Sequence, residues 1–213
     1  MPEHALRQQL CDYALALGSS GLSVGRSGNL SVRFGEHCLV TPSGVDYQQL
    51  SPADMVLIDL DGNTVAGALQ PSSEWHFHCG LYRARADVHA VVHAHPTYCT
   101  SLACSRRHIP AFHYMVAVAG GKDIPLAPYA LFGTEELSGH VLKALQERQA
   151  CLLANHGMIA VGRNLPAAFN LALEVETLAQ QYCEVLKLGE PCLLNDAQMD
   201  AVLAKFSGYG QRV

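Results

Sequence analysis

Two histidines separated by one residue, His93 and His95, end a short apolar run that is typical of a strand. Side chains at positions i and i+2 point to one face of a strand, with Cα atoms roughly 6.5–7 Å apart. Two imidazoles held in this way can bind one metal ion from the same side. Glu74 lies upstream and His156 downstream, so the four residues offer three neutral nitrogens and a carboxylate. This ligand set suits one catalytic zinc ion.

A His-x-His pair alone is a weak signal, because such pairs arise by chance. His156 strengthens it, because this residue lies at a predicted strand end, where sites tend to form. Structural zinc sites usually draw four Cys and His ligands from short spacings, whereas these ligands come from distant segments. The pattern therefore favours a catalytic site that forms only after folding. We interpret the other eight histidines as surface or ordinary hydrogen-bonding residues: His4, His37, His76, His78, His89, His108, His113 and His140.

Three short segments indicate an anion pocket beside this metal site. Gly28-Asn29 and Ser43-Gly44 place small residues and backbone N–H groups in turns, which can form an anion-binding nest. Ser72-Ser73 lies at the predicted start of a helix, where backbone donors and the helix dipole favour phosphate. Each segment alone is more often a turn or a helix cap. Their combination next to Glu74 predicts a phosphate pocket.

Composition is that of a globular protein, and we expect one domain over residues 1–213. The chain is 49% hydrophobic and 15% charged, enough apolar material for a substantial core. The net charge of −5, with no basic cluster larger than Arg106-Arg107, argues against nucleic acid as a partner. No apolar run reaches the roughly 18–20 residues needed to span a membrane. Eight scattered cysteines and no evident signal peptide indicate a cytoplasmic protein with reduced thiols.

Hydrophobic periodicity predicts an α/β fold. We expect helices near residues 6–17, 72–85, 98–104, 134–147 and 165–188, and a last helix opened by a capping box from Asn195 to Gln198. Strands are expected near residues 30–34, 56–60, 91–95, 114–118, 151–154 and 158–161. No repeat, low-complexity stretch or linker interrupts this pattern.

Five segments of the chain resemble, in order and spacing, the class II aldolase and adducin head family. They are residues 27–33, Thr41-Pro42-Ser43-Gly44, Pro71-Ser72-Ser73-Glu74-Trp75, His93-Ala94-His95 and Asn155-His156-Gly157. The resemblance covers nearly the whole chain. It implies a three-layer α/β/α domain with a central mixed, mainly antiparallel sheet. It also implies a homotetramer with active sites at the subunit interfaces.

The resemblance also implies roles for individual residues. His93, His95 and His156 would bind one zinc ion per subunit, and Glu74 would be both a resting ligand and the acid/base of turnover. Tyr114 would reach the neighbouring subunit's site. The phosphate would be held by Gly28, Asn29, Ser43, Gly44, Ser72 and Ser73, and the aldehyde side would be shaped by Phe132 and Tyr209. Arg26 departs from the family pattern, which has a small hydroxylated residue there, so it either adds a phosphate contact or crowds the pocket.

The implied reaction is reversible cleavage of L-fuculose 1-phosphate, or of a close 1-phosphoketose, to dihydroxyacetone phosphate and L-lactaldehyde or a related aldehyde. Zinc would stabilise the enediolate as a Lewis acid, and Glu74 would transfer the proton at carbon. Three other activities stay open: a methylthioribulose-1-phosphate dehydratase, a sugar-acid phosphate decarboxylase and a pentulose-phosphate 4-epimerase, whose pattern has aspartate in place of Glu74. A non-catalytic adducin-like scaffold would not need the three histidines and Glu74, so their presence argues against it. A zinc hydrolase is compatible with these ligands, but nothing else in the sequence supports it.

Overall fold

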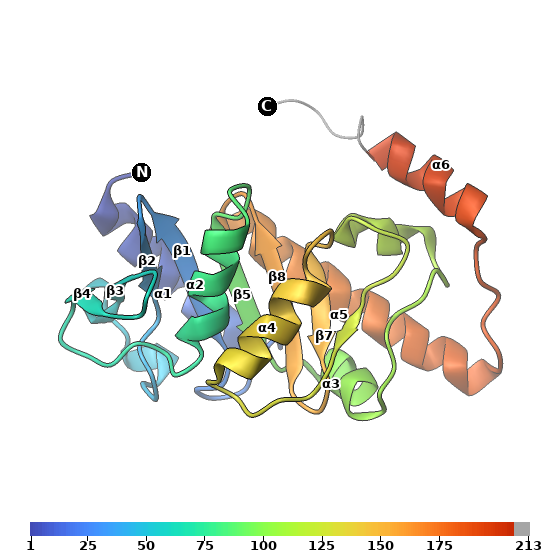
Figure 1. Cartoon of the computed structure of the whole chain (residues 1–213). Coiled ribbons are helices and arrows are strands. Elements are labelled where there is room, and N and C mark those ends of the chain that lie inside the picture. Colours follow the sequence, from blue (N-terminus) through green and yellow to red (C-terminus); the bar gives the residue numbers. More distant parts are fainter. Residues whose placement is uncertain (207–213) are drawn as a thin grey trace.

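A computed structural model describes residues 1–206 and shows a sheet between two layers of helices (Figure 1). Eight strands form the sheet in the order β4-β3-β2-β1-β5-β8-β7-β6. Every neighbouring pair is antiparallel except β6 and β7, which run parallel, so the predicted mixed, mainly antiparallel sheet is confirmed. The strands are β1 (Asn29–Phe34), β2 (His37–Val40), β3 (Val56–Asp59), β4 (Thr64–Ala66), β5 (Ala90–Ala94), β6 (Leu126–Ala127), β7 (Ala150–Leu153) and β8 (Gly157–Gly162).

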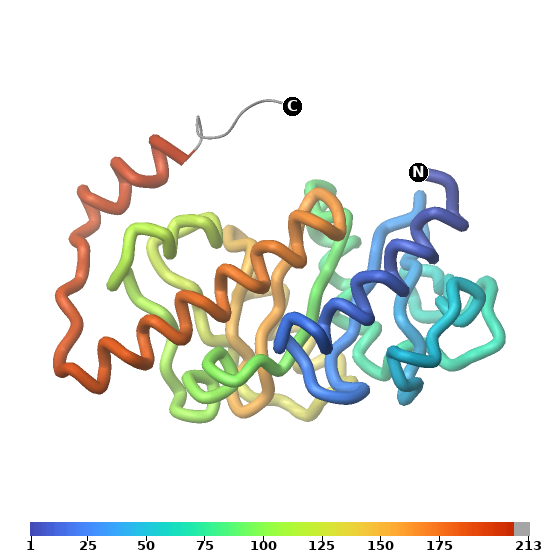
Figure 2. Tube along the Cα trace, turned by 180° about the vertical axis from the view of Figure 1, so that it is seen from behind, coloured from blue at the N-terminus to red at the C-terminus, as the bar shows by residue number. Residues whose placement is uncertain are grey.

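Helices cover both faces of this sheet. One face carries α2 and α4, which lie in front of the strands in Figure 1, and the view from behind in Figure 2 shows α1 and α5 across the other face. A separate helix, α6, packs against the 3-10 helix η3. The bounds are α1 (Glu3–Ser19), α2 (Trp75–Ala84), α3 (Thr97–Cys104), η3 (Tyr114–Ala119), α4 (Glu135–Ala144), α5 (Leu165–Leu188) and α6 (Asp196–Phe206).

The sheet separates two apolar cores, and alternation along β1 shows how. Leu30 and Val32 are buried in the larger core, under α1, α3 and α5. Ser31 points to the opposite face, where its hydroxyl contacts the side chains of His78 and Tyr82 on α2. The α2 face of β1 is therefore polar although it is buried, and this polar strip runs toward the predicted metal site.

Two helical predictions are confirmed closely. The longest helix spans Leu165–Leu188, as expected, and Gly189 ends it. The predicted capping box opens α6, because the Asn195 and Gln198 side chains each accept a hydrogen bond of 2.9 Å from the other's backbone N–H. Among the described residues, no helix combines the length and apolar character that a bilayer crossing needs.

The predicted helix start at Ser72-Ser73 is wrong, because α2 begins at Trp75. The Ser72 N–H donates to the Thr41 carbonyl at 3.0 Å, and the Ser72 hydroxyl accepts from the Glu74 N–H at 3.3 Å. These bonds hold residues 72–74 in a turn that ties the start of α2 to the segment after β2. Glu74 consequently occupies the N-cap position, with its side chain free to face the site.

The predicted strand at residues 114–118 is also wrong, since these residues form η3. Val116 and Ala119 are fully buried in the larger core, and residues 114–119 are not part of the described sheet. The His113 ring accepts a hydrogen bond from the Met115 N–H at 3.3 Å, which starts the helical turn. The helix predicted over residues 134–147 is α4, which ends at Ala144, three residues before the expected end.

Candidate active site

His93 lies at the centre of the sheet, on β5 between β1 and β8. It is fully buried and stands opposite Asn29 in the β1–β5 register. Its Nδ1 lies 2.9 Å from the Met158 carbonyl oxygen on β8. A carbonyl only accepts, so Nδ1 carries the proton and donates, and Nε2 faces the site. This bond fixes the orientation of the ring, as outer partners of metal-binding histidines commonly do.

His95 and His156 complete a cluster of three imidazoles. His95 follows β5, and its Nε2 lies 2.9 Å from Nε2 of His93. His156 comes from the turn between β7 and β8, with its ring centroid 4.8 Å from that of His93. One nitrogen from each ring lies within 4.8 Å of the others. Two nitrogen lone pairs as close as those of His93 and His95 repel unless a proton or a metal ion lies between them.

The corner around His156 explains the residue types beside it. Asn155 has φ of 53°, in the left-handed region where asparagine is among the better tolerated residues. A Cβ at Gly157 would lie 2.4 Å from the Ala94 carbonyl oxygen and 2.5 Å from Cδ2 of His95. Only glycine fits there, because any side chain would push the His156 turn away from the end of β5.

Glu74 brings the carboxylate to this cluster. Its side chain is buried, with Oε2 3.1 Å from Nε2 of His93 and Oε1 3.4 Å from Nε2 of His156. Oε1 has no hydrogen-bond partner within the described chain, and a buried carboxylate oxygen is costly to leave unpaired. The histidine nitrogens and this oxygen together fit a divalent metal ion of the zinc type.

The electrostatics of the cluster keep its ligands in the metal-binding form. Burial, followed by repulsion from His93 and His156, lowers the pKa of His95 to about 3. Burial and repulsion from His93 lower the pKa of His156 to about 4. Burial raises the pKa of the Glu74 carboxyl, but His93, His156 and the Asn29 amide outweigh it and lower that pKa overall. At neutral pH His95 and His156 are neutral and Glu74 is ionised.

A cavity of about 370 Å³ opens beside the cluster. It holds all six residues predicted to bind phosphate, together with Phe132. Its lining consists of Arg26, Ser27, Gly28, Asn29, Pro42, Ser43, Gly44, Ser72, Ser73, Glu74, His95, Tyr129, Ala130, Phe132, Asn155 and His156. A Cβ on Gly28, which has φ of 90°, would lie 2.8 Å from the His93 carbonyl oxygen, so the predicted phosphate loop packs directly on β5.

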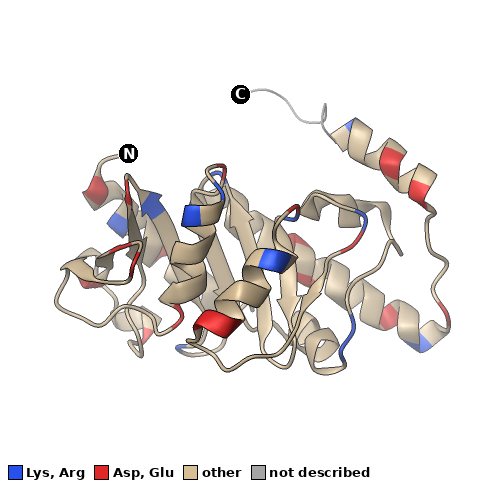
Figure 3. Cartoon of the chain, in the orientation of Figure 1, with Lys and Arg blue, Asp and Glu red and all other residues tan. Residues whose placement is uncertain are grey.

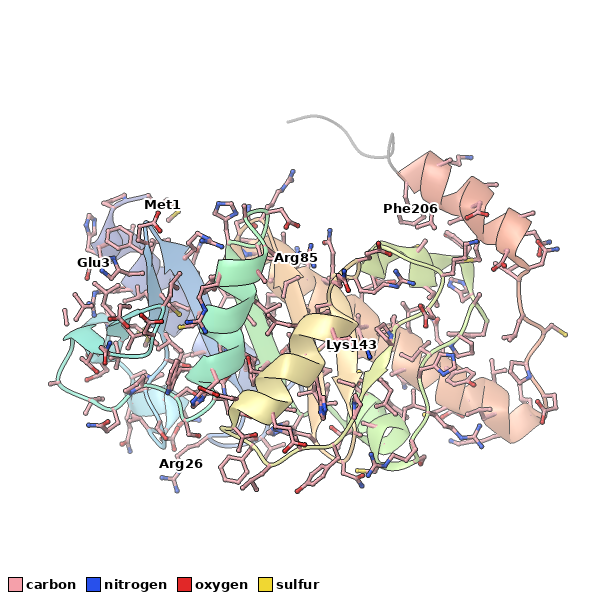
Figure 4. The ribbon with its side chains drawn as sticks, in the orientation of Figure 1. Met1, Glu3, Arg26, Arg85, Lys143 and Phe206 are labelled. Atoms are coloured by element: carbon pink, nitrogen blue, oxygen red, sulfur yellow. The ribbon has the colours of Figure 1, made fainter. Side chains whose placement is uncertain are left out.

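Arg26 supplies positive charge to this cavity, where the family pattern has a small hydroxylated residue. Its guanidinium donates to the Gly44 carbonyl at 2.9 Å and so joins the two predicted phosphate turns. No other Lys or Arg in the described part of the chain lines the cavity. Figure 4 shows Arg26 at the lower edge of the molecule. Charged residues elsewhere are scattered in small groups (Figure 3).

The structure describes one of the two tyrosines predicted for the site. Tyr114 is half exposed on η3 and does not line the cavity. Tyr209 lies outside the described residues. Asn29 lines the cavity, but both polar atoms of its side chain already have partners. Its Nδ2 donates to Glu74 Oε2 at 3.0 Å, and its Oδ1 lies 2.6 Å from Nε2 of His78.

His78 is the residue that reasoning from the sequence missed. We interpreted it as an ordinary histidine, yet it is fully buried and joins Asn29 to Ser31 through its two ring nitrogens. A signal was present in the helix, where Glu74, His78 and Tyr82 follow each other at intervals of four and so share one face.

The fold and this cluster define an α/β/α protein with a candidate metal site, and comparison with known proteins assigns its family. The chain belongs to the class II aldolase and adducin family: residues 8–183 match the family described as "Class II Aldolase and Adducin N-terminal domain". The resemblance inferred from the five motifs is confirmed.

Three relatives match nearly full length. A "5-methylthioribulose-1-phosphate/5-deoxyribulose-1-phosphate aldolase" of Rhodospirillum rubrum is 53% identical, covering 97% of this chain and 93% of its own. An "L-fuculose phosphate aldolase" of Escherichia coli is 47% identical, covering 100% of this chain and 99% of its own. A solved "L-fuculose 1-phosphate aldolase" superposes with a TM-score of 0.92 at 44% identity, covering 95% of this chain and 96% of its own.

Proposed function

We propose that this protein is a zinc-dependent aldolase that cleaves the C3–C4 bond of a 1-phosphoketose. The observation that carries the proposal is Glu74 Oε1, a buried carboxylate oxygen without a hydrogen-bond partner in the described chain. It lies beside three imidazoles and lines a cavity that also holds the predicted phosphate turns. The same cavity therefore offers a metal site, an acid/base group and an anion site.

In our proposal, cleavage leaves the electron pair of the C3–C4 bond on C3. A zinc ion held by His93, His95 and His156 would supply a Lewis acid for the negative charge that develops on the substrate. Glu74, which is ionised in the resting site, first takes up a proton and then transfers it to C3, which yields dihydroxyacetone phosphate; the proton released from the C4 hydroxyl balances this uptake. Tyr114 of a neighbouring subunit takes up the proton of the C4 hydroxyl as the aldehyde forms. None of the chain's lysines lines the cavity, so the described chain offers no amine for a Schiff base.

The phosphate site is proposed at the turns of the cavity. Gly28, Ser43 and Gly44 offer backbone donors, Ser72 and Ser73 offer hydroxyls, and Arg26 adds a guanidinium. Binding of a phosphate there orients the substrate at a distance from the reacting carbon. Phe132 lies in the same lining, where we propose that it contacts the aldehyde half together with Tyr209.

The named relatives act on substrates that differ only beyond C4. Cleavage of L-fuculose 1-phosphate gives L-lactaldehyde, whereas cleavage of 5-deoxyribulose 1-phosphate gives acetaldehyde, and both release dihydroxyacetone phosphate. We propose L-fuculose 1-phosphate as the first substrate to test. The identity to the Rhodospirillum rubrum relative makes the 5-deoxy and 5-methylthio pentulose phosphates the second candidates.

The proposal is tested by coupled detection of dihydroxyacetone phosphate. Zinc-loaded protein is given L-fuculose 1-phosphate, 5-deoxyribulose 1-phosphate or 5-methylthioribulose 1-phosphate, and the same protein treated with a chelator is the control. Release that the chelator abolishes supports the aldolase and ranks the sugars by kcat/KM. Absence of release from zinc-loaded protein with all three sugars would overturn the aldolase and shift the interpretation to dehydration or decarboxylation.

We also propose a cytoplasmic homotetramer. The half-exposed Tyr114, held on η3 away from the cavity of its own chain, supports a site shared between subunits. All eight cysteines are free thiols, which suits a reducing compartment. Light scattering of the purified protein tests the tetramer, and a monomer with full activity would contradict the shared site.

A further inference from the structure

Behind Glu74 runs a chain of buried polar side chains that leads away from the cavity. Asn29 Nδ2 lies 3.0 Å from Glu74 Oε2, and Asn29 Oδ1 lies 2.6 Å from Nε2 of His78. Nδ1 of His78 lies 2.7 Å from the Ser31 hydroxyl, which lies 2.7 Å from the Tyr82 hydroxyl. His78 and Ser31 are fully buried. These four contacts connect the candidate acid/base to the interior between β1 and α2.

The direction of every hydrogen bond in this chain follows from its first member. An ionised Glu74 carboxylate only accepts, so the Asn29 amide nitrogen must face it and the amide oxygen must face His78. That oxygen also only accepts, so Nε2 of His78 carries a proton. A neutral His78 then accepts at Nδ1 from the Ser31 hydroxyl, and Ser31 accepts from Tyr82.

Independent features of the site agree with this assignment. Burial, followed by repulsion from His93, lowers the pKa of His78 to about 3, which keeps the ring neutral with a single N–H. Burial raises the pKa of Tyr82 well above its usual value, so its hydroxyl keeps the proton that it donates. Each donor in such a chain polarises the next, and a fully satisfied buried network holds its members in one arrangement.

We propose that His78 is a positioning residue that acts through Asn29 to hold the Glu74 carboxylate. This hydrogen-bonded network binds Oε2 of Glu74. It leaves Oε1, which has no hydrogen-bond partner within residues 1–206, to exchange the proton with the substrate. Without the His78 N–H, the Asn29 amide oxygen loses its donor, and only the bond to Glu74 still fixes the amide, so the carboxylate is held less firmly. This inference rests on the proposed role of Glu74 in aldol cleavage.

The first test compares two replacements of His78 with a matched control. His78→Leu removes both ring nitrogens, whereas His78→Gln can still present an N–H to Asn29. His76→Leu makes the same change two residues away on α2, where the His76 ring stacks on Trp75. We expect His78→Leu to lower kcat by roughly 10–100-fold, with KM within threefold and zinc content unchanged. His78→Gln restores kcat to within about fivefold of the original protein, and His76→Leu stays within threefold of it.

The second test reads the ring itself and needs no substrate. Long-range ¹H–¹⁵N correlation spectra of protein labelled at histidine identify the tautomer, and loss of one signal in His78→Gln assigns it to residue 78. We expect a neutral ring with the proton on Nε2 at pH 7. A proton on Nδ1, or a doubly protonated ring, would overturn the proposed direction of the chain. Full kcat in His78→Leu would overturn the positioning role.

Two further outcomes separate this proposal from the proposed function. If the original protein cleaved none of the phosphoketoses, the proposed aldolase function would be overturned. The tautomer measurement would still test the proposed hydrogen-bond directions from Glu74 to Tyr82. If His78→Leu failed to fold, Tyr82→Phe would replace it, because that change removes only the terminal hydroxyl. We expect Tyr82→Phe to lower kcat about threefold at unchanged KM. A rise in KM larger than the fall in kcat would contradict positioning through Glu74.

Discussion

The two ends of the candidate active-site cavity are built differently. At the metal end, His93 and Glu74 are buried and held by hydrogen bonds to Met158 and Asn29. At the anion end, Ser43 and Gly44 lie in exposed turns, and exposed Arg26 bridges to the Gly44 carbonyl. Buried, satisfied networks tolerate little change, whereas exposed turns vary freely between relatives. The reaction should therefore depend on the metal end, and the strength of substrate binding on the anion end.

The largest effect that tests this contrast is loss of the metal. We expect His93→Ala to retain less than a tenth of the zinc and to lose at least 10³-fold in kcat/KM, because both its ring nitrogens are committed at the centre of the sheet. Metal analysis and the coupled assay measure the two quantities. His89→Ala is the control, since His89 is exposed just before β5. Zinc retained at full occupancy in His93→Ala would remove this residue from the ligand set.

The next effect separates metal binding from proton transfer. Glu74→Gln keeps the shape of the side chain and an oxygen that can accept from Asn29, but it cannot carry the proton. We expect kcat to fall by roughly 10²–10⁴-fold, as for the loss of a general acid/base group, with zinc bound at no less than half occupancy. Steady-state measurements at saturating substrate give kcat without contributions from substrate binding. A Glu74→Gln protein with full cleavage activity would refute the assigned role.

The anion end should respond in KM instead of kcat. Arg26→Ser restores the small hydroxylated residue of the family pattern and removes the only cationic side chain that lines the cavity within the described chain. We expect KM for a 1-phosphoketose to rise about tenfold, which corresponds to about 1.4 kcal/mol, with kcat within twofold. Arg163→Ser, an exposed arginine just after β8, is the control. An unchanged or lower KM would mean that Arg26 crowds the pocket instead of binding phosphate.

The same contrast explains what could be predicted from the sequence. His93, His95 and His156 were identifiable because ligand spacing and strand ends are local features, and the family motifs place Glu74 among them. His78 was not identifiable, because its partners Asn29 and Ser31 lie on a strand about 50 residues away. Only the pairing of β1 with β5, and the packing of α2 across both, brings these polar faces together. Local patterns report single elements, whereas a buried network depends on two elements at once.

The error at residues 114–118 has a related cause. A short apolar run is compatible with a strand or with a buried helical turn, and periodicity cannot separate the two. The described structure decides it through the larger core, which takes up Val116 and Ala119 from η3. For Phe132 the prediction came from the family resemblance and not from periodicity. Its side chain is exposed, yet it lines the cavity as that resemblance implies. Whether Tyr114 reaches a neighbouring site stays a prediction, because it depends on a second subunit.

The smallest expected effect concerns pH and the metal-free protein. Burial lowers the pKa of His95 to about 3 and that of His156 to about 4, whereas a free imidazole has a pKa of about 6.5. Between pH 6.5 and 4 the unfolded chain therefore binds more protons than the folded chain, and stability falls as pH falls. We expect the Tm of chelator-treated protein to drop by roughly 5–10 °C from pH 6.5 to 4.5 and to stay level from pH 6.5 to 8.

Two variants assign this pH dependence to one end of the cavity. The double variant His95→Gln/His156→Gln retains only His78 among the strongly shifted imidazoles, so its Tm should fall by about a third as much over the same interval. Arg26→Ser should keep the full fall, because the guanidinium stays charged throughout this range. Calorimetric scans at each pH measure both. Equal slopes in the original protein and the double variant would show that the acid sensitivity lies outside the metal end, and the contrast between the two ends would then rest on catalysis alone.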